Sequence, residues 1–384
     1  MKGLVEIFLV SLRLGSTSFG GPTAHLGYFQ KEYVQRRKWL TDKQYADLVA
    51  LSQFLPGPAS SQVGMGIGLI RGGIAGSIVS FIGFTLPSVI ALACFAFYYV
   101  QGDISTGWIH GLKLVAIAIV AQAIWEMMKK LLPTWKHYSL GIASLILLLL
   151  WNSPFAQVGI IIIAGLIGYI LINSISSGYD KVSLRISKKL GSIFLAIFAL
   201  LLIVLPLVSN KVDLLWVTLF EKFYLSGSLV FGGGHVVLPL LEAQFVQADL
   251  ITAEEFLTGY GLTQAVPGPL FTFASYIGML VNGFPGAIIA TIAIFLPAFL
   301  LVLGAMPFWL SISSHPKLRG AIAGMNAAVV GILGAAFINP IVWETIGTWK
   351  DILFSIILLL LLIRLKWSPV TIVILGVLIG ILFY

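Results

Sequence analysis

The sequence has few charged residues and almost no cysteine. Charged residues make up 10% of the 384 residues and hydrophobic residues 59%, and the mean hydropathy is +1.01. This composition excludes a water-soluble globular domain, because too few polar side chains are present to cover its surface. The single cysteine, Cys94, excludes a disulfide within the chain and a cysteine-based metal site.

Sequence motifs of catalysis and nucleotide binding are also missing. The chain contains no HExxH, no GxxxxGK[ST], no GxSxG with a plausible triad and no paired carboxylates in an apolar run. We therefore expect neither an enzyme nor a cofactor or metal, and no stretch is polar enough for the nucleotide domain of an ATP-driven pump. The net charge of +8 comes mainly from short loops between apolar runs, so we expect lipid rather than nucleic acid as the partner.

Long apolar runs dominate what is present. Segments such as 140–151, 158–172, 189–208 and 352–363 are apolar on every helical face, whereas strands of a membrane barrel would alternate. The sequence therefore predicts an all-α polytopic membrane protein.

The chain repeats itself at an offset of 210 to 212 residues. SFGGPTAHLGYFQKEYV (18–34) matches VFGGGHVVLPLLEAQFV (230–246), and LTDKQYADLVALSQFLPGP (40–58) matches ITAEEFLTGYGLTQAVPGP (251–269). We therefore expect a first transporter repeat over 1–173 and a second over 212–384. Between them, 174–211 is predicted to be a cytoplasmic linker followed by one extra transmembrane helix.

Loop charges indicate that the two repeats have opposite orientations in the membrane. The loop 31–43 carries five basic residues, whereas its repeat counterpart, 242–255, carries four acidic residues and no basic one. Positive-inside bias places the first loop in the cytoplasm and the second outside, with the N-terminus cytoplasmic. Two inverted repeats with broken or re-entrant helices are typical of secondary transporters, whose substrate site lies near mid-membrane between the repeats.

The repeated breaks suggest where a substrate would bind. Pro56-Gly57-Pro58 must interrupt a helix, and an irregular backbone is tolerated in a membrane only where it is buried in protein or lines a wet cavity. The helix starts that follow the PGP and FGG motifs present free N–H groups and hydroxyls, which attract anions. The predicted substrate-binding residues are Arg13, Gly20, Gly21, Thr23, Gln53, Gly57, Ser60, Ser61, Lys113, Gly232, Gly233, Gly234, His235, Gln264, Gly268, Thr272 and Asn326.

Each of these signals has a plainer interpretation. Proline and glycine also serve as simple kinks in membrane helices, and Gln53 and Gln264 could form interhelical hydrogen bonds. Arg13, the preferred fixed cation for an anion, and Lys113 could instead extend toward lipid headgroups. A channel, a non-transporting scaffold and a membrane-embedded enzyme remain alternatives to a carrier. The oligomeric state, a homodimer included, stays open.

The chain resembles the chromate ion transporter family in several long motifs. They include RLGSTSFGGPTAHLGYF (13–29), WLTDKQYADLVALSQFLPGPASSQ (39–62), FGGGHVVLPLLE (231–242), GYGLTQAVPGPLFTFASYIG (259–278) and GMNAAVVGIL (324–333). The resemblance implies a two-domain carrier in the inner (cytoplasmic) membrane that exports chromate, with sulfate as competitor or counter-substrate. Uptake or exchange of sulfate or another oxyanion is the alternative.

Overall fold

The computed structural model describes residues 2–101, 106–151, 153–172, 187–231, 234–309 and 315–384, and the regular elements in these ranges are all helical. Five of the described segments are long and apolar enough to cross a membrane: Ala59–Val100, Gly107–Leu131, Lys188–Ser209, Leu270–Phe308 and Pro316–Thr345. The prediction of an all-α polytopic membrane protein is confirmed.

The helices of the two sequence repeats correspond in order, although more short 3-10 and π-helical segments divide the second repeat. The first consists of α1 (Lys2–Thr17), α2 (Gly21–Phe29), η1 (Gln30–Arg36), α3 (Asp42–Phe54), α4 (Ala59–Gln101), α5 (Thr106–Leu131), α6 (Trp135–Leu150) and α7 (Pro154–Leu171). The second consists of α9 (Leu215–Ser228), η2 (Gly234–Val236), α10 (Val237–Leu241), η3 (Glu242–Val246), α11 (Ala253–Thr263), η4 (Leu270–Thr272), α12 (Phe273–Ala305), η5 (Met306–Phe308), α14 (Pro316–Ala336), η6 (Phe337–Val342), α15 (Trp343–Thr345), α16 (Trp349–Ile363) and α17 (Pro369–Phe383).

Local structure is repeated in detail. The π-helical segment η1 starts at Gln30 and η3 starts at Glu242, which are equivalent positions in the two repeats. The following helices α3 and α11 both begin with a capping box, in which a threonine and the residue three positions later satisfy each other's backbone N–H groups. The same capping arrangement therefore sets the start of the equivalent helix in each repeat.

Two of the longest helices are hairpins. In α4, Gly73 has a φ of 66° and a ψ of −158°, and Gly283 has similar values in α12. The Ser80 hydroxyl donates to the Gly64 carbonyl at 2.9 Å, although a straight helix would place residues 16 apart about 24 Å from each other. The segments before and after Gly73 therefore lie antiparallel, so α4 is not a single long span.

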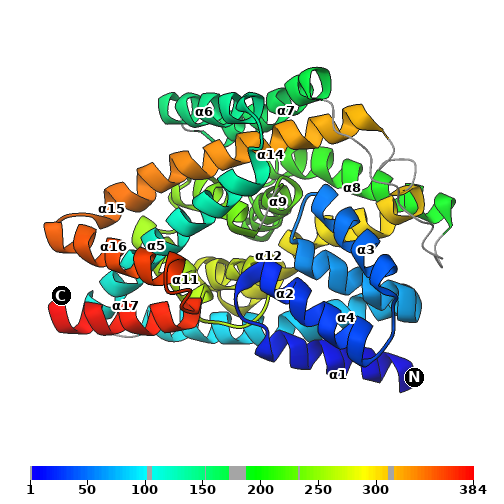
Figure 1. Cartoon of the computed structure of the whole chain (residues 1–384), viewed down its shortest axis with the longest axis horizontal. Coiled ribbons are helices and arrows are strands. Elements are labelled where there is room, and N and C mark those ends of the chain that lie inside the picture. The colour runs from blue at the N-terminus through cyan, green and yellow to red at the C-terminus, as the bar shows by residue number, and fades with distance from the viewer. Residues whose placement is uncertain (1, 102–105, 152, 173–186, 232–233, 310–314) are drawn as a thin grey trace.

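The two repeats interlock. Helix α5 of the first repeat packs against α16 and α17 of the second, and α14 of the second packs against α6 and α7 of the first. Figure 1 shows α6 and α7 beside α14, and α16 and α17 beside α5, on different sides of the molecule. The hairpins α4 and α12 also contact each other directly. The two sequence repeats thus exchange their last two helices in space, and their bounds at 1–173 and 212–384 stay a prediction.

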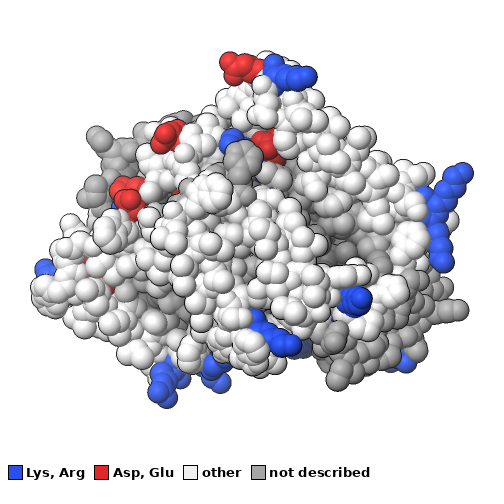
Figure 2. All heavy atoms as spheres, turned by 90° about the horizontal axis from the view of Figure 1, so that it is seen from above, with Lys and Arg blue, Asp and Glu red and all other residues white. Residues whose placement is uncertain are grey.

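The surface carries large apolar side chains and little charge. Exposed isoleucine, leucine and tryptophan side chains recur on α6, α7, α16 and α17, and in the extra helix α8 (Lys188–Ser209) only Gly191 is buried, the other residues being exposed or half-buried. Figure 2 shows a face that is covered mostly by uncharged residues. Such a surface suits a lipid environment. The opposite orientation of the repeats in the membrane stays a prediction from the loop charges.

Glycines allow the exchanged helices to approach closely. A Cβ at Gly111 of α5 would collide with the carbonyl oxygen of Gly376 in α17, and a Cβ at Gly324 of α14 would collide with that of Ala164 in α7. Small residues of this kind let membrane helices gain van der Waals contact along their backbones. The interlocked arrangement therefore depends on these positions.

We expect Gly111→Leu to separate α5 from α17 and to destabilise the protein by about 1–3 kcal/mol, the usual cost of overpacking. Thermal unfolding in detergent measures the effect. Gly159→Leu is the matched control, because a Cβ at Gly159 has no atom within 4 Å. Equal melting temperatures for the two variants would contradict this account of the packing.

Candidate functional site

Each Pro-Gly-Pro break is held by the other repeat. The Gly57 N–H donates to the Val230 carbonyl at 2.7 Å, and the Gly268 N–H donates to the Ser18 carbonyl at 3.0 Å. Ser18 and Val230 are equivalent residues, and each directly precedes an FGG motif. The two hydrogen bonds therefore tie the PGP of each repeat to the FGG segment of the other, so that the broken segments of both repeats meet.

The backbone at these breaks requires glycine. The φ angles are 120° at Gly57 and 112° at Gly268, and they are 94° at Gly20 and 74° at Gly21. Residues with a Cβ adopt such angles only with strain. Gly20 is the N-cap of α2, so the FGG motif sets the start of a helix, as the sequence predicts. In the second repeat Gly232 and Gly233 lie outside the described residues, and η2 begins at Gly234.

A cavity of about 380 Å³, here called the central cavity, lies where these segments meet. Eight of the predicted site residues line it: Gly20, Gly21, Gln53, Gly57, Gly234, His235, Gln264 and Asn326. Its volume lies at the lower end of the range of small-molecule sites, so it has room for a small ion with some of its water. The structure thus brings residues from five separate segments, which are far apart in sequence, around one space.

Helix α5 supplies a wall of the central cavity that the sequence reasoning missed. Gln122, Glu126 and Lys130 line the cavity, and the Gln122 side chain donates to Glu126 at 2.8 Å. Their spacing of four residues places them on one face of α5. That spacing is a signal that the sequence itself contains. Ser52, Pro22 and Pro369 were also missed.

A smaller cavity of about 20 Å³ adjoins the central one. Both are lined by Gly20, Gly21, Pro22, His235 and Gln264, and the smaller cavity adds Thr263 and Gly268. The shared residues therefore lie between a large space and a small one. The wall between the two spaces is thus built from the broken segments of both repeats.

Polar groups in the central cavity lack partners within the protein. The Gln264 Nε2 and the Asn326 Oδ1 are buried and have no hydrogen-bond partner among the described residues. An unsatisfied buried amide is costly, which favours a ligand or water at this position. His235 is held by the Tyr260 hydroxyl, 2.8 Å from its Nδ1. The cavity therefore offers amide groups to a polar ligand.

The remaining predicted residues lie outside the described lining of the central cavity. Lys113 Nζ binds Glu254 Oε2 at 2.7 Å, and the Thr272 hydroxyl donates to the Pro269 carbonyl at 2.7 Å. Ser60 Oγ lies 3.3 Å from the Nδ1 of His25, and the buried Ser61 hydroxyl has no hydrogen-bond partner among the described residues. Thr23 belongs to α2, and its side chain is outside the described part.

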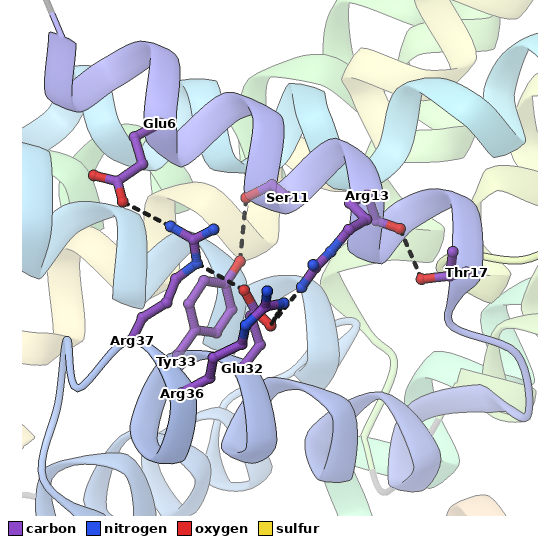
Figure 3. A network of polar contacts seen from close by, with 8 residues as sticks. All are labelled: Glu6, Ser11, Arg13, Thr17, Glu32, Tyr33, Arg36 and Arg37. Atoms are coloured by element: carbon purple, nitrogen blue, oxygen red, sulfur yellow. Dashed lines mark hydrogen bonds and ion pairs between the residues drawn. The ribbon is translucent and has the colours of Figure 1, made fainter.

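Arg13 also lies outside this lining and forms an ion pair with Glu32 (Figure 3). Arg37 Nε contacts the same carboxylate at 2.7 Å and Arg36 Nη1 contacts it at 3.3 Å, while a second nitrogen of Arg37 lies 2.6 Å from Glu6. We call the three guanidiniums around Glu32 the arginine cluster. In this conformation the charge of Arg13 is used to neutralise Glu32 and to join α1 to η1.

The arginine cluster controls the protonation of Glu32. Desolvation raises the pKa of this carboxyl, but hydrogen bonds from Arg37 and Arg13 outweigh it and hold the pKa below its ordinary value. The Glu32 side chain is only 7% exposed, so the carboxylate depends on these partners. The ionised form therefore stabilises the fold at neutral pH.

Comparison with known proteins identifies the family. Residues 5–169 and 217–381 each match the sequence model of the chromate transporter family. The chain belongs to the chromate transporter family. It is therefore a multi-pass membrane protein of a transporter family, and both of its repeats carry the family pattern.

Individual relatives agree with this assignment. An uncharacterized transporter of Methanocaldococcus jannaschii is 28% identical over 98% of this chain and 93% of its own length. A chromate transport protein of Cupriavidus metallidurans is 26% identical over 99% of this chain and 93% of its own length. An uncharacterized transporter of Bacillus subtilis, 28% identical, matches over 93% of its own length but only 42% of this chain. No solved structure matches the chain.

We expect Gly57→Ala to destabilise the protein by about 1–3 kcal/mol, the usual cost of a strained backbone angle. The new Cβ would also lie 2.9 Å from Gln62 Nε2 and 3.1 Å from the Ala298 Cβ. Gly268→Ala should behave alike, because its Cβ would lie 2.7 Å from the Ser88 hydroxyl. Thermal unfolding checks both variants against Gly27→Ala, a helical site with open space, and a wild-type melting temperature for Gly57→Ala would refute the expectation.

We expect Glu32→Gln to lower the melting temperature at neutral pH. The melting temperature of this variant should also fall less than that of the wild type as the pH is lowered. The folded pKa of Glu32 is lowered, so its contribution to stability is present above the ordinary pKa of the carboxyl and is lost as the pH falls through the lowered value. Melting curves from pH 7 down to about pH 3 test this expectation. Glu344→Gln, at an exposed carboxyl, is the control, and a wild-type pH profile for Glu32→Gln would contradict the role of the arginine cluster.

Proposed function

We propose that this protein exports chromate across the inner (cytoplasmic) membrane by alternating access. The observation that carries the proposal is the central cavity, where the broken segments of both repeats meet and where Gln264 Nε2 is buried without a partner among the described residues. Chromate transport is the activity named for three similar proteins, those of Cupriavidus metallidurans, Pseudomonas aeruginosa and Synechococcus elongatus, the last as probable.

The chemistry of the central cavity supports an oxyanion. A tetrahedral dianion has four oxygens that accept hydrogen bonds, and amide groups together with backbone N–H groups at helix starts are suitable donors. Gly57 and Ala59, on either side of the Pro58 that precedes α4, line the cavity, and the first N–H groups of a helix have no partner within it. Gln53, Gln122 and Gln264 supply further amides. Hydrogen bonds of this kind bind chromate and sulfate alike.

The membrane potential is a sufficient energy source for export. A dianion that moves outward through an inside-negative potential of 100 mV gains about 4.6 kcal/mol. In the proposed cycle the broken segments move against one another, so that the wall shared by the two cavities opens to one side at a time. The hydrogen bonds of Gly57 to Val230 and of Gly268 to Ser18 cross between the repeats, and we place the movement at these contacts.

The test is radioactive chromate flux into proteoliposomes, with and without an imposed potential and with excess sulfate as competitor. We expect saturable flux that increases with the potential and is inhibited by sulfate. Flux that does not respond to the potential would reject the proposed energy source. Flux of sulfate but not of chromate would show that sulfate is the substrate instead of chromate. The absence of any oxyanion flux would reject the proposal.

We expect Gln264→Ala to raise the KM for chromate by about 10- to 100-fold, which corresponds to the loss of one hydrogen bond to a charged group. The matched control is Gln30→Ala. Gln30 is exposed and bonds Asp42 at 3.2 Å, outside the central cavity. An unchanged KM in Gln264→Ala, with the control also unchanged, would show that this amide does not contact the substrate.

A further inference from the structure

A second polar cavity lies in the second repeat, away from the residues assigned to chromate. Glu242, the first residue of η3, is 5% exposed and lines a cavity of about 20 Å³ together with Gln157 and Asn339. The other lining residues, Leu148, Leu149, Ala335 and Ala336, are apolar. The volume is enough for one water molecule. We call this space the Glu242 cavity.

The carboxyl of Glu242 lacks a cationic partner among the described residues. Its hydrogen bonds come from the Gln247 side chain, whose Nε2 lies 3.1 and 3.4 Å from the two carboxyl oxygens. Glu32, on the equivalent π-helical segment of the first repeat, is surrounded by the arginine cluster. An ionised carboxylate that is buried without a cation is unfavourable, so this position favours a protonated carboxyl.

The nearby ionisable groups are engaged elsewhere. On α9, Lys222 donates to Gln244 at 3.3 Å and its neighbour is Glu221. On α11, Glu254 pairs with Lys113, Glu255 caps the helix, and Tyr260 bonds His235. The described parts of α6, α7 and η6 bring no ionisable side chain to the Glu242 cavity. None of these groups neutralises Glu242.

The hydrogen bonding of Gln157 independently indicates that this cavity needs a hydrogen-bond donor. Its Nε2 donates to the Pro239 carbonyl at 3.3 Å, which fixes the orientation of the amide. Its Oε1 is buried and has no partner among the described residues, and the side chain is 1% exposed. An amide oxygen and a carboxylate can both only accept hydrogen bonds. A proton on Glu242 would supply the donor that Gln157 Oε1 lacks.

We propose that Glu242 is a proton-binding site that couples proton movement to transport. The proton adds to one carboxylate oxygen, and the resulting neutral carboxyl donates to Gln157 Oε1 directly or through one water. The cavity reaches the surface at Asn339, which is exposed, and the loop charges place this end of the protein outside. The coupling, but not the proton site itself, rests on the proposed transport of chromate.

The helical segment that carries Glu242 also reaches the central cavity. Elements η2, α10 and η3 follow one another without interruption from Gly234 to Val246, with His235 in the lining of the central cavity and Glu242 in that of the other. Seven residues of helix span about 10 Å. A change in the charge of Glu242 can therefore shift His235 through one short helical segment.

The first experiment measures the proton without transport. Infrared difference spectra of the purified protein, recorded during a pH titration, should show the C=O stretch of a protonated buried carboxyl. We expect this band to be lost in Glu242→Gln and kept in Asp249→Asn. Asp249 is an exposed acid in the turn that follows η3, with a φ of 54°, an angle that asparagine also tolerates. A band that persists in Glu242→Gln would overturn the proton site.

The second experiment measures coupling in proteoliposomes. With the potential clamped at zero, an imposed pH gradient should change wild-type and Asp249→Asn flux several-fold and leave Glu242→Gln flux unchanged. A wild-type pH response in Glu242→Gln, or flux that requires Na⁺ instead of responding to pH, would overturn the coupling. If the wild type moves no chromate at all, the proposed function fails, whereas the infrared result still decides whether Glu242 binds a proton.

Discussion

The structure depends on two backbone hydrogen bonds that cross between the repeats. Gly57 reaches Val230 and Gly268 reaches Ser18, so each Pro-Gly-Pro break is satisfied by the partner repeat. An interrupted helix at membrane depth leaves N–H and carbonyl groups that water cannot reach, and they must be paired within the protein. The positive φ angles, the helix starts at Gly21 and Gly234, and the cavity between them all lie at these paired breaks.

Much of this arrangement could be predicted from the sequence because the repeat doubles every local signal. Gly20, Gly21, Gly57 and Gln264 were predicted from FGG and PGP motifs that occur twice, and all four line the central cavity. The helical class follows from runs that are apolar on every face. These inferences need only the local chemistry of proline and glycine and the spacing between the two copies.

The parts of the fold and of the site that the sequence does not predict depend on contacts between segments far apart in the chain. The sequence suggests Arg13 as the cation for an anionic substrate. Its partner Glu32, however, lies 19 residues away on a π-helical segment, and no residue pattern predicts where that segment starts. Lys113 pairs with Glu254, which lies 141 residues away in the sequence, and the packing of α5 against α16 and α17 has no signature in either repeat alone. Long-range packing of this kind is decided by shape, here by glycines such as Gly111 and Gly376.

The exchange of helices between repeats has a consequence for the order of synthesis. Helix α5 leaves the ribosome long before α16 and α17, the helices it packs against, have been made. Until α16 and α17 have been synthesised, the glycine-lined face of α5 is therefore covered by lipid or by transient neighbours in the bilayer. A truncated chain that ends after α14 would insert its first repeat and still leave α5 without its final partners, so assembly is completed from the C-terminus.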